Sequence, residues 1–266
     1  MTRVNLVRVT LLFVTSVSMN LALSGVAHAE SFDKPIRETT VDLGPTPYML
    51  PSSGARIKLF CSYYPTFMVK QLNDEGQKGT QEVTIVHIRK GIVPSCRRSH
   101  AFGQRVIDKD GRFFIGVKNQ LLFLEDPDGD NGGMYFHVVD WKNGKELFRD
   151  SALLGRTGIN VKFVDTSEGE FSLSYRRVVA GDCSIAKDGM SCWNKFKEKL
   201  GLQSTEVPTC TGYRTETEKE RVVGDPGVPP EELDTPSVIV YPVAVELFPT
   251  PSVKAAPGLV NCWPVS

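Results

Sequence analysis

The chain has 266 residues, and its 31 lysines and arginines balance its 31 aspartates and glutamates. This balance argues against nucleic acid and anionic membranes as obligate partners, because both require a concentrated positive surface. With 41% hydrophobic and 23% charged residues, the composition is typical of a globular protein that can bury a core without a cofactor.

Residues 1–29 are predicted to form a signal peptide that is cut off during export. Two arginines give it a positive start, residues 9–26 are apolar with polar interruptions, and an Ala-His-Ala motif ends at Ala29. Cleavage is expected between Ala29 and Glu30. The Ser, Thr and Asn residues within this run make it too polar for a membrane-spanning helix, which needs about 20 predominantly apolar residues. The mature chain is therefore expected to be soluble, and periplasmic or secreted.

All six cysteines lie in the mature part of the chain. An even number of cysteines in an exported protein predicts up to three disulfides. Spacing favours the pairs Cys183–Cys192, Cys61–Cys96 and Cys210–Cys262. A zinc site is disfavoured because the sequence has no CxxC or HxxxH pair, and a free catalytic thiol is disfavoured because such cysteines are normally paired.

The region 56–180 is predicted to be an antiparallel β domain, a meander that forms a sandwich or a barrel-like structure. The segment 171–175 alternates apolar and polar residues with the period of two of a half-buried strand, and 81–89 alternates as well. Residues 30–55, which precede this domain, are expected to be an extended segment. The chain as a whole is therefore predicted to be mainly β.

Three hairpin turns are predicted within the β domain. They lie at Asp110-Gly111, in the Gly-rich run 129–133, and at Asn143-Gly144. Asn-Gly and Asp-Gly provide the positive φ angles that a tight hairpin requires.

The C-terminal part, residues 181–266, is predicted to contain one short amphipathic helix and to be otherwise rich in loops. The helix is expected at 190–200, with Ser191 as N-cap and Gly201 as the stop. The polar, Pro-rich stretch 203–236 is expected to form a long exposed loop.

A last strand is expected from Val238 to Leu247. Pro242 within it predicts a sheet edge or a bulge, because proline cannot donate to the ladder. Disulfides are expected to pack this C-terminal part onto the β domain.

Asp126, Asp128 and Asp130 alternate as the first ligands of a calcium loop do. The second half of the motif fails, because His137 replaces the bidentate glutamate at position 12. The favoured interpretation is an acidic hairpin turn. No cofactor is expected, and weak calcium binding stays open as the alternative.

No catalytic motif accompanies the three histidines of the mature chain, so no catalytic residue is assigned. His87 is expected to face inward from its strand, and His137 to face away from its two neighbours. Ser99 and His100 are adjacent in a loop, but adjacency in sequence does not bring a nucleophile and a base together. The possibility that two carboxylates act as acid and base stays open, because the sequence does not give the distance between them.

Six aromatic residues are candidates to line a peptide or carbohydrate groove, although core packing is their ordinary role. They are Tyr63, Tyr64, Tyr135, Trp141, Trp193 and Trp263.

The expected function is a non-catalytic binding or structural module of the bacterial cell envelope, whose partner is an unidentified protein or glycan. The alternative is a hydrolase that acts on envelope polymers. A concave site with two or more titratable groups of shifted pKa would favour the hydrolase.

Overall fold

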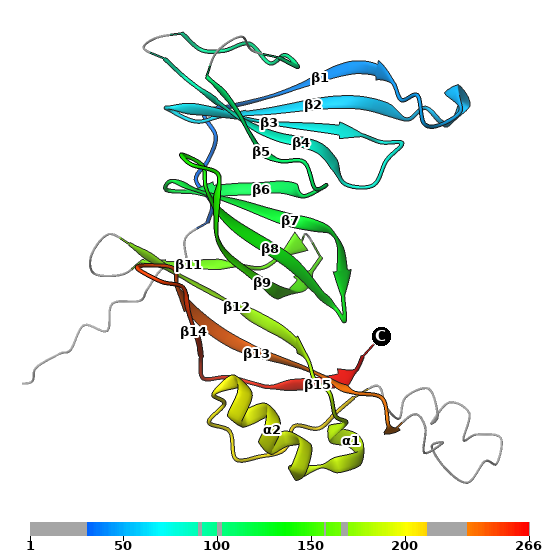
Figure 1. Cartoon of the computed structure of the whole chain (residues 1–266), viewed down its shortest axis with the longest axis vertical. Helices are drawn as coiled ribbons and strands as arrows, with labels where there is room; N and C mark the ends of the chain where they lie inside the picture. Colours follow the sequence, from blue (N-terminus) through cyan, green and yellow to red (C-terminus); the bar gives the residue numbers. More distant parts are fainter. Residues whose placement is uncertain are drawn as a thin grey trace, which may run out of the picture.

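The structure is a computed structural model that describes residues 31–89, 92–99, 103–156, 158–165, 170–211 and 233–265. The predicted signal peptide, its cleavage site at Ala29 and Glu30, and His100 lie outside these residues. Figure 1 shows two antiparallel sheets that follow one another along the longest axis, with two helices at the end of the second sheet. The prediction of a mainly β fold is confirmed, and the sheets pack as a sandwich rather than a closed barrel.

The first sheet has five strands. They are β1 (Arg37–Pro45), β2 (Arg56–Tyr63), β3 (Phe67–Asp74), β4 (Thr80–His87) and β5 (Gln104–Asp108), in this order across the sheet. The prediction of an extended segment up to residue 55 missed β1, which pairs along β2 and forms one edge. A short 3-10 helix, Pro51–Ser53, lies in the β1–β2 connection.

The second sheet has ten strands. They are β6 (Phe113–Lys118), β7 (Leu121–Asp130), β8 (Gly133–Asp140), β9 (Lys145–Gly155), β10 (Gly158–Ile159), β11 (Lys162–Asp165), β12 (Phe171–Ala180), β13 (Ser237–Glu246), β14 (Ser252–Ala255) and β15 (Asn261–Pro264). The main order is β14-β13-β12-β9-β8-β7-β6, while β10 pairs with β9, β11 with β12 and β15 with β13.

Two of the three predicted hairpins are confirmed. Asn131 and Gly132 both have positive φ and join β7 to β8, and Gly144, with φ 74°, lies in the turn between β8 and β9. The third is wrong, because Asp110-Gly111 connects β5 to β6, and these strands belong to different sheets.

A shared apolar core holds the two sheets together. Phe67 and Ile85 from the first sheet meet Leu122 and Leu124 from the second, and all four are buried. Trp141 packs on Phe67 with ring centroids 4.6 Å apart. Alternation along β4 and β7 brings these side chains to the facing surfaces.

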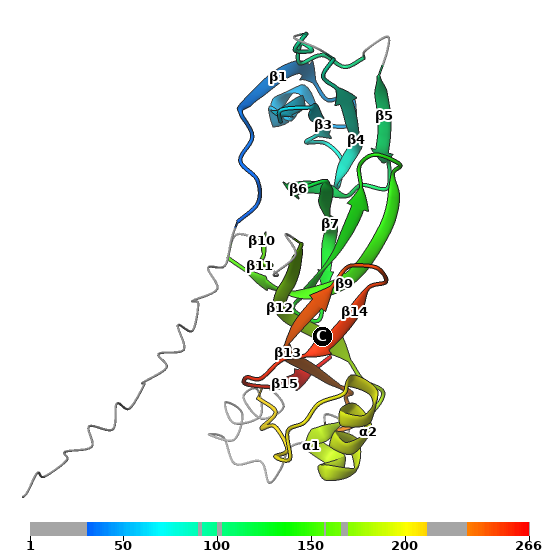
Figure 2. The same cartoon turned by 90° about the vertical axis from the view of Figure 1, so that its left-hand side faces the viewer.

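The N-terminal strap, residues 31–36, runs beside both sheets before the chain enters β1 (Figure 2). The Phe32 ring lies edge-on to Phe163, with centroids 5.0 Å apart. Gly116 makes room for it, since a Cβ there would lie 2.4 Å from the Phe32 ring. The Asp33 N–H donates to the Val117 carbonyl over 2.7 Å, so the strap binds the edge of β6.

The amphipathic helix is confirmed as α2 (Met190–Leu200), which ends at Gly201 in the left-handed conformation. Its N-cap is Gly189, however, so Ser191 lies inside the helix and does not cap it. A short helix that was not expected, α1 (Ile185–Asp188), precedes it. Among the described residues, no helix is both long and apolar enough to span a membrane.

The cysteines form the three predicted pairs, with Cα–Cα distances of 5.8, 5.8 and 4.3 Å. They are Cys61–Cys96, Cys183–Cys192 and Cys210–Cys262. Each bridge is local to its part of the chain, so the expectation that disulfides fasten residues 181–266 to the β domain is wrong. Backbone pairing of β13 with β12 makes that connection instead.

Pro242 does not mark a sheet edge or a bulge. β13 is paired with β12 on one side and with β14 and β15 on the other. The Pro242 carbonyl accepts from the Ala256 N–H, so its nitrogen faces the same side. The partner chain bends away between β14 and β15 at this point, and no ladder donor is needed from the proline.

Candidate functional site

A cleft lies between the two sheets, beneath the N-terminal strap. Its volume is about 380 Å³. We call it the inter-sheet cleft; it is lined by strap residues 32–35, Glu38, Phe60, Ser62, Tyr64, Val69, Gln71 and β6 residues 114–116. Aromatic rings, a hydroxyl, an amide and charged groups of both signs therefore share one concave surface, as is usual for ligand sites.

One wall of the inter-sheet cleft is the edge strand β6. The Phe114 N–H, which points out of the sheet, donates to Oε1 of Gln71 over 2.7 Å. Further along the same edge the Val117 carbonyl accepts from the strap. Both groups are bonded within the chain, and the bond to the strap shows that the edge of β6 can bind an extended segment laid along it.

Tyr64 is the one groove candidate among the six aromatic residues that lines this cleft. Burial raises the pKa of its phenol, and the nearby Asp33 and Glu38 carboxylates raise the pKa further. The phenol therefore stays protonated and able to donate a hydrogen bond to a ligand across the physiological pH range.

Alkaline pH should destabilise the fold through this tyrosine. Because the folded pKa lies above the ordinary value of 10.0, the contribution of Tyr64 is intact below that value and is lost as the pH rises above it. We expect Tyr64→Phe to leave urea unfolding at pH 7 nearly unchanged and to flatten the decline above pH 10. Tyr48→Phe is the control, because Tyr48 is 65% exposed. An identical alkaline decline in both variants would contradict this.

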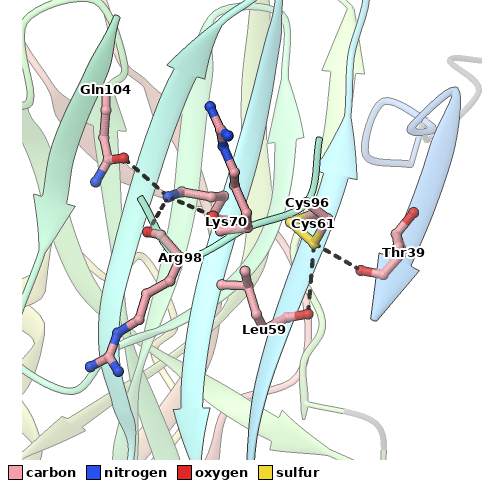
Figure 3. Close-up of a disulfide and its surroundings, with 8 residues drawn as sticks. Thr39, Leu59, Cys61, Lys70, Cys96, Arg98 and Gln104 are labelled. Atoms are coloured by element: carbon pink, nitrogen blue, oxygen red, sulfur yellow. Dashed lines mark hydrogen bonds between the residues drawn. A yellow bond between two sulfur atoms is a disulfide. The ribbon is translucent and has the colours of Figure 1, made fainter. Parts of the chain in front are cut away.

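A second concave region, to which Lys70, Arg98 and Gln104 contribute, lies on the outer face of the first sheet. Figure 3 shows the hydrogen bonds of Lys70 and the nearby disulfide. Lys70 is 2% exposed, and its Nζ donates to the Arg98 carbonyl at 2.8 Å and to Oε1 of Gln104 at 3.1 Å. Burial lowers the lysine pKa, while Glu82 opposes this. The Cys61–Cys96 disulfide fastens the same loop.

The Lys70 ammonium is therefore committed to holding the loop of residues 96–99 over the sheet. A third acceptor, the Arg97 carbonyl, lies 3.3 Å from Nζ. An ammonium has three protons to donate, so a nucleophilic role would require the loop to open. We assign this region to the architecture rather than to ligand chemistry.

His137 lies at the centre of a polar network that joins the two sheets. The ring is fully buried, its Nδ1 lies 2.8 Å from Oε2 of Glu146, and its Nε2 lies 2.9 Å from Oδ1 of Asp126. Arg112 contacts Asp126 at 3.5 Å and Asp108 of β5 at 3.0 Å. With an acceptor carboxylate at each nitrogen, the ring has no nitrogen open to a substrate.

The chain matches no known family model, no curated protein and no solved structure. Its function must therefore be argued from its own geometry.

The structure does not gather the predicted calcium ligands into a site. Asp126, Asp128 and Asp130 all lie within β7. Asp126 contacts His137, and Asp128 forms an ion pair with Lys78. Among the residues described, no three His, Cys, Asp or Glu side chains are arranged to hold a metal ion.

His87 lies on the same face of β4 as Ile85, as predicted, but the expectation that it is a core histidine is wrong. The residue is exposed at the end of β4, where its ring lies 5.1 Å from that of Trp141. His137 faces away from Phe136 and Val138, whose side chains belong to a different buried cluster. Ser99 is exposed in the loop after Cys96, and its neighbour His100 lies outside the described residues.

The other five aromatic candidates do not line the inter-sheet cleft. Trp193 and Tyr63 are buried, and Trp141 belongs to the core between the sheets. Tyr135 stacks under the guanidinium of Arg149, and Trp263 donates to the Asn131 carbonyl. Their roles are packing roles, as their residue type predicts.

Proposed function

We propose that the mature chain is a non-catalytic binding module of an exported protein, periplasmic or secreted, which holds an extended peptide segment of a partner in the inter-sheet cleft. The observation that carries this proposal is the strap on the edge of β6. The Asp33 N–H bonds to the Val117 carbonyl there, so this edge already binds one extended segment of polypeptide.

A peptide is favoured because main-chain hydrogen bonds to a sheet edge supply affinity, while neighbouring pockets select side chains. Residues 114–116 of β6 line the cleft next to the strap. Phe60 and Tyr64 provide aromatic surface, and the Ser62 hydroxyl provides a polar group. Three disulfides are typical of proteins that fold outside the cytoplasm.

A hydrolase is less well supported. A nucleophile and its base must lie within hydrogen-bonding reach of each other in an accessible cleft. Neither of the two described histidines lines this cleft. His137 is enclosed by two carboxylates, and His87 lies beside Trp141.

Filling the cleft should weaken peptide binding. Short synthetic peptides selected on the mature protein from an immobilised library are expected to bind Ser62→Trp more weakly by a factor of at least about ten, because the indole occupies the space beside Tyr64. Calorimetric titration measures the affinity. Ser172→Trp is the matched control, since Ser172 is also half-buried in a strand and lines no cleft described above.

Two outcomes would overturn the proposal. Unchanged affinity in a folded Ser62→Trp variant would remove the cleft as the site. Selective binding of chitin or peptidoglycan fragments on a glycan array, with no peptide bound, would replace the peptide by a glycan.

A further inference from the structure

The second sheet forks between β9 and β12. These strands pair through a single residue pair, Arg177 with Ala152. Beyond that point β10 continues alongside β9, while β11 continues alongside β12. A cleft of about 290 Å³, the fork cleft, opens where the strands diverge.

The polar side chains that line the fork cleft are donors. They are Asn160, Lys162, Ser174, Tyr175 and Arg176. The Tyr175 hydroxyl already donates its proton to Asp150 over 2.5 Å, so it is not a donor for a ligand. No carboxylate is among the lining residues, so the surface of the cleft carries positive charge and suits a ligand that accepts hydrogen bonds.

The two cations of the fork cleft have no carboxylate partner in the part of the chain that the structure describes. Nη2 of Arg176 donates to the side-chain Oδ1 of Asn261, and to the carbonyls of Val240 and Leu259 at 3.3 Å each. Lys162 is exposed and takes part in none of the ion pairs of the described residues. The next strand position differs: Arg177 pairs with Asp150 at 2.9 Å.

The remaining wall is apolar. Leu153, Leu154 and Pro242 line it, and Leu154 is 44% exposed. A large exposed aliphatic side chain beside uncompensated positive charge matches a ligand with an apolar part and an anionic head. The volume is at the lower end for ligand pockets, which begin at about 300 Å³, so the ligand is small.

We propose that the fork cleft binds a small amphipathic anion, a carboxylate that carries a short alkyl chain. The carboxylate accepts hydrogen bonds from Lys162 and Ser174, and the alkyl chain covers Leu153 and Leu154. The donors of the fork cleft select for a charged head group. The alkyl chain of the ligand adds apolar contacts that an inorganic anion cannot make. This site is separate from the inter-sheet cleft, and either proposal can fail without the other.

The test is calorimetric titration of the mature protein with decanoate, with decanol and with inorganic phosphate. Decanoate is expected to bind, and decanol and phosphate each to bind at least about tenfold more weakly, because each lacks one half of the recognition. Lys162→Gln should weaken decanoate by about tenfold and leave decanol unchanged.

Lys145→Gln is the matched control, since Lys145 is an exposed strand lysine outside the cleft. Equal decanoate affinity in the two lysine variants would overturn the assignment of the head group. Phosphate that binds as tightly as decanoate would overturn the amphipathic class. A second variant, Leu154→Asp, places a negative charge in the cleft and should abolish decanoate binding; retained binding would rule out this cleft.

Discussion

Replacing Cys210 and Cys262 together by serine is expected to lower the free energy of unfolding by about 4 kcal/mol. The bridge spans 52 residues, and in the chain-entropy model a longer closed loop restricts the unfolded chain more. A loss of this size is a large part of the whole stability of a domain, which is about 5 to 15 kcal/mol. Urea unfolding of the mature protein measures it.

The matched control is the double replacement of Cys183 and Cys192, which are only 9 residues apart. Its expected loss is about 3 kcal/mol, because the shorter loop leaves the unfolded chain more freedom. A larger loss from this pair than from Cys210 and Cys262 would show that native packing around the helices, rather than loop length, determines what each bridge contributes.

Much of the fold could be predicted because its signals are local. The alternation at residues 171–175 and the Asn143-Gly144 turn depend on neighbours in sequence. Asp110-Gly111 looked the same but leads from one sheet to the other. A turn signal reports a reversal or bend of the chain, and it does not say which strand the next segment will pair with.

β1 was missed for a related reason. Its burial pattern is mostly exposed, because it is an edge strand with little core-facing surface. Hydrophobic alternation, the main signal for a strand, is weakest where only one neighbour is present. Pro242 predicted an edge strand, but β13 lies inside the sheet. The bend between β14 and β15 leaves no backbone acceptor opposite Pro242, so the missing N–H costs no ladder hydrogen bond.

The candidate sites could not be predicted from sequence. The inter-sheet cleft joins Phe32, Gln71 and Phe114, which are far apart in the chain and belong to no motif. The fork cleft depends on where β9 and β12 stop pairing. Sequence indicated one relevant residue, Tyr64, but as one of six aromatic candidates with nothing to rank them.

The fork itself is stabilised by a buried polar network. Asp150 is 7% exposed and accepts hydrogen bonds from Nε of Arg177 at 2.9 Å and from the Tyr175 hydroxyl at 2.5 Å. Arg177 also donates to the Tyr241 hydroxyl at 3.3 Å. Since β9 and β12 share a single residue pair, these side chains supply much of the connection between the two halves of the second sheet.

Asp150→Ala is therefore expected to lower the free energy of unfolding by about 3 kcal/mol, because it leaves the Arg177 charge and the Tyr175 hydroxyl without their partner.

Asp42→Ala is the matched control. Its partner Arg56 is 43% exposed in the side chain and Asp42 is 49% exposed, so solvent screens this pair and the loss should be much smaller than that from Asp150→Ala. Replacing both Asp150 and Arg177 by leucine removes the charges together and should recover part of the loss. Urea unfolding followed by circular dichroism measures all three variants. Equal losses from Asp150→Ala and Asp42→Ala would mean that backbone pairing alone holds the fork together.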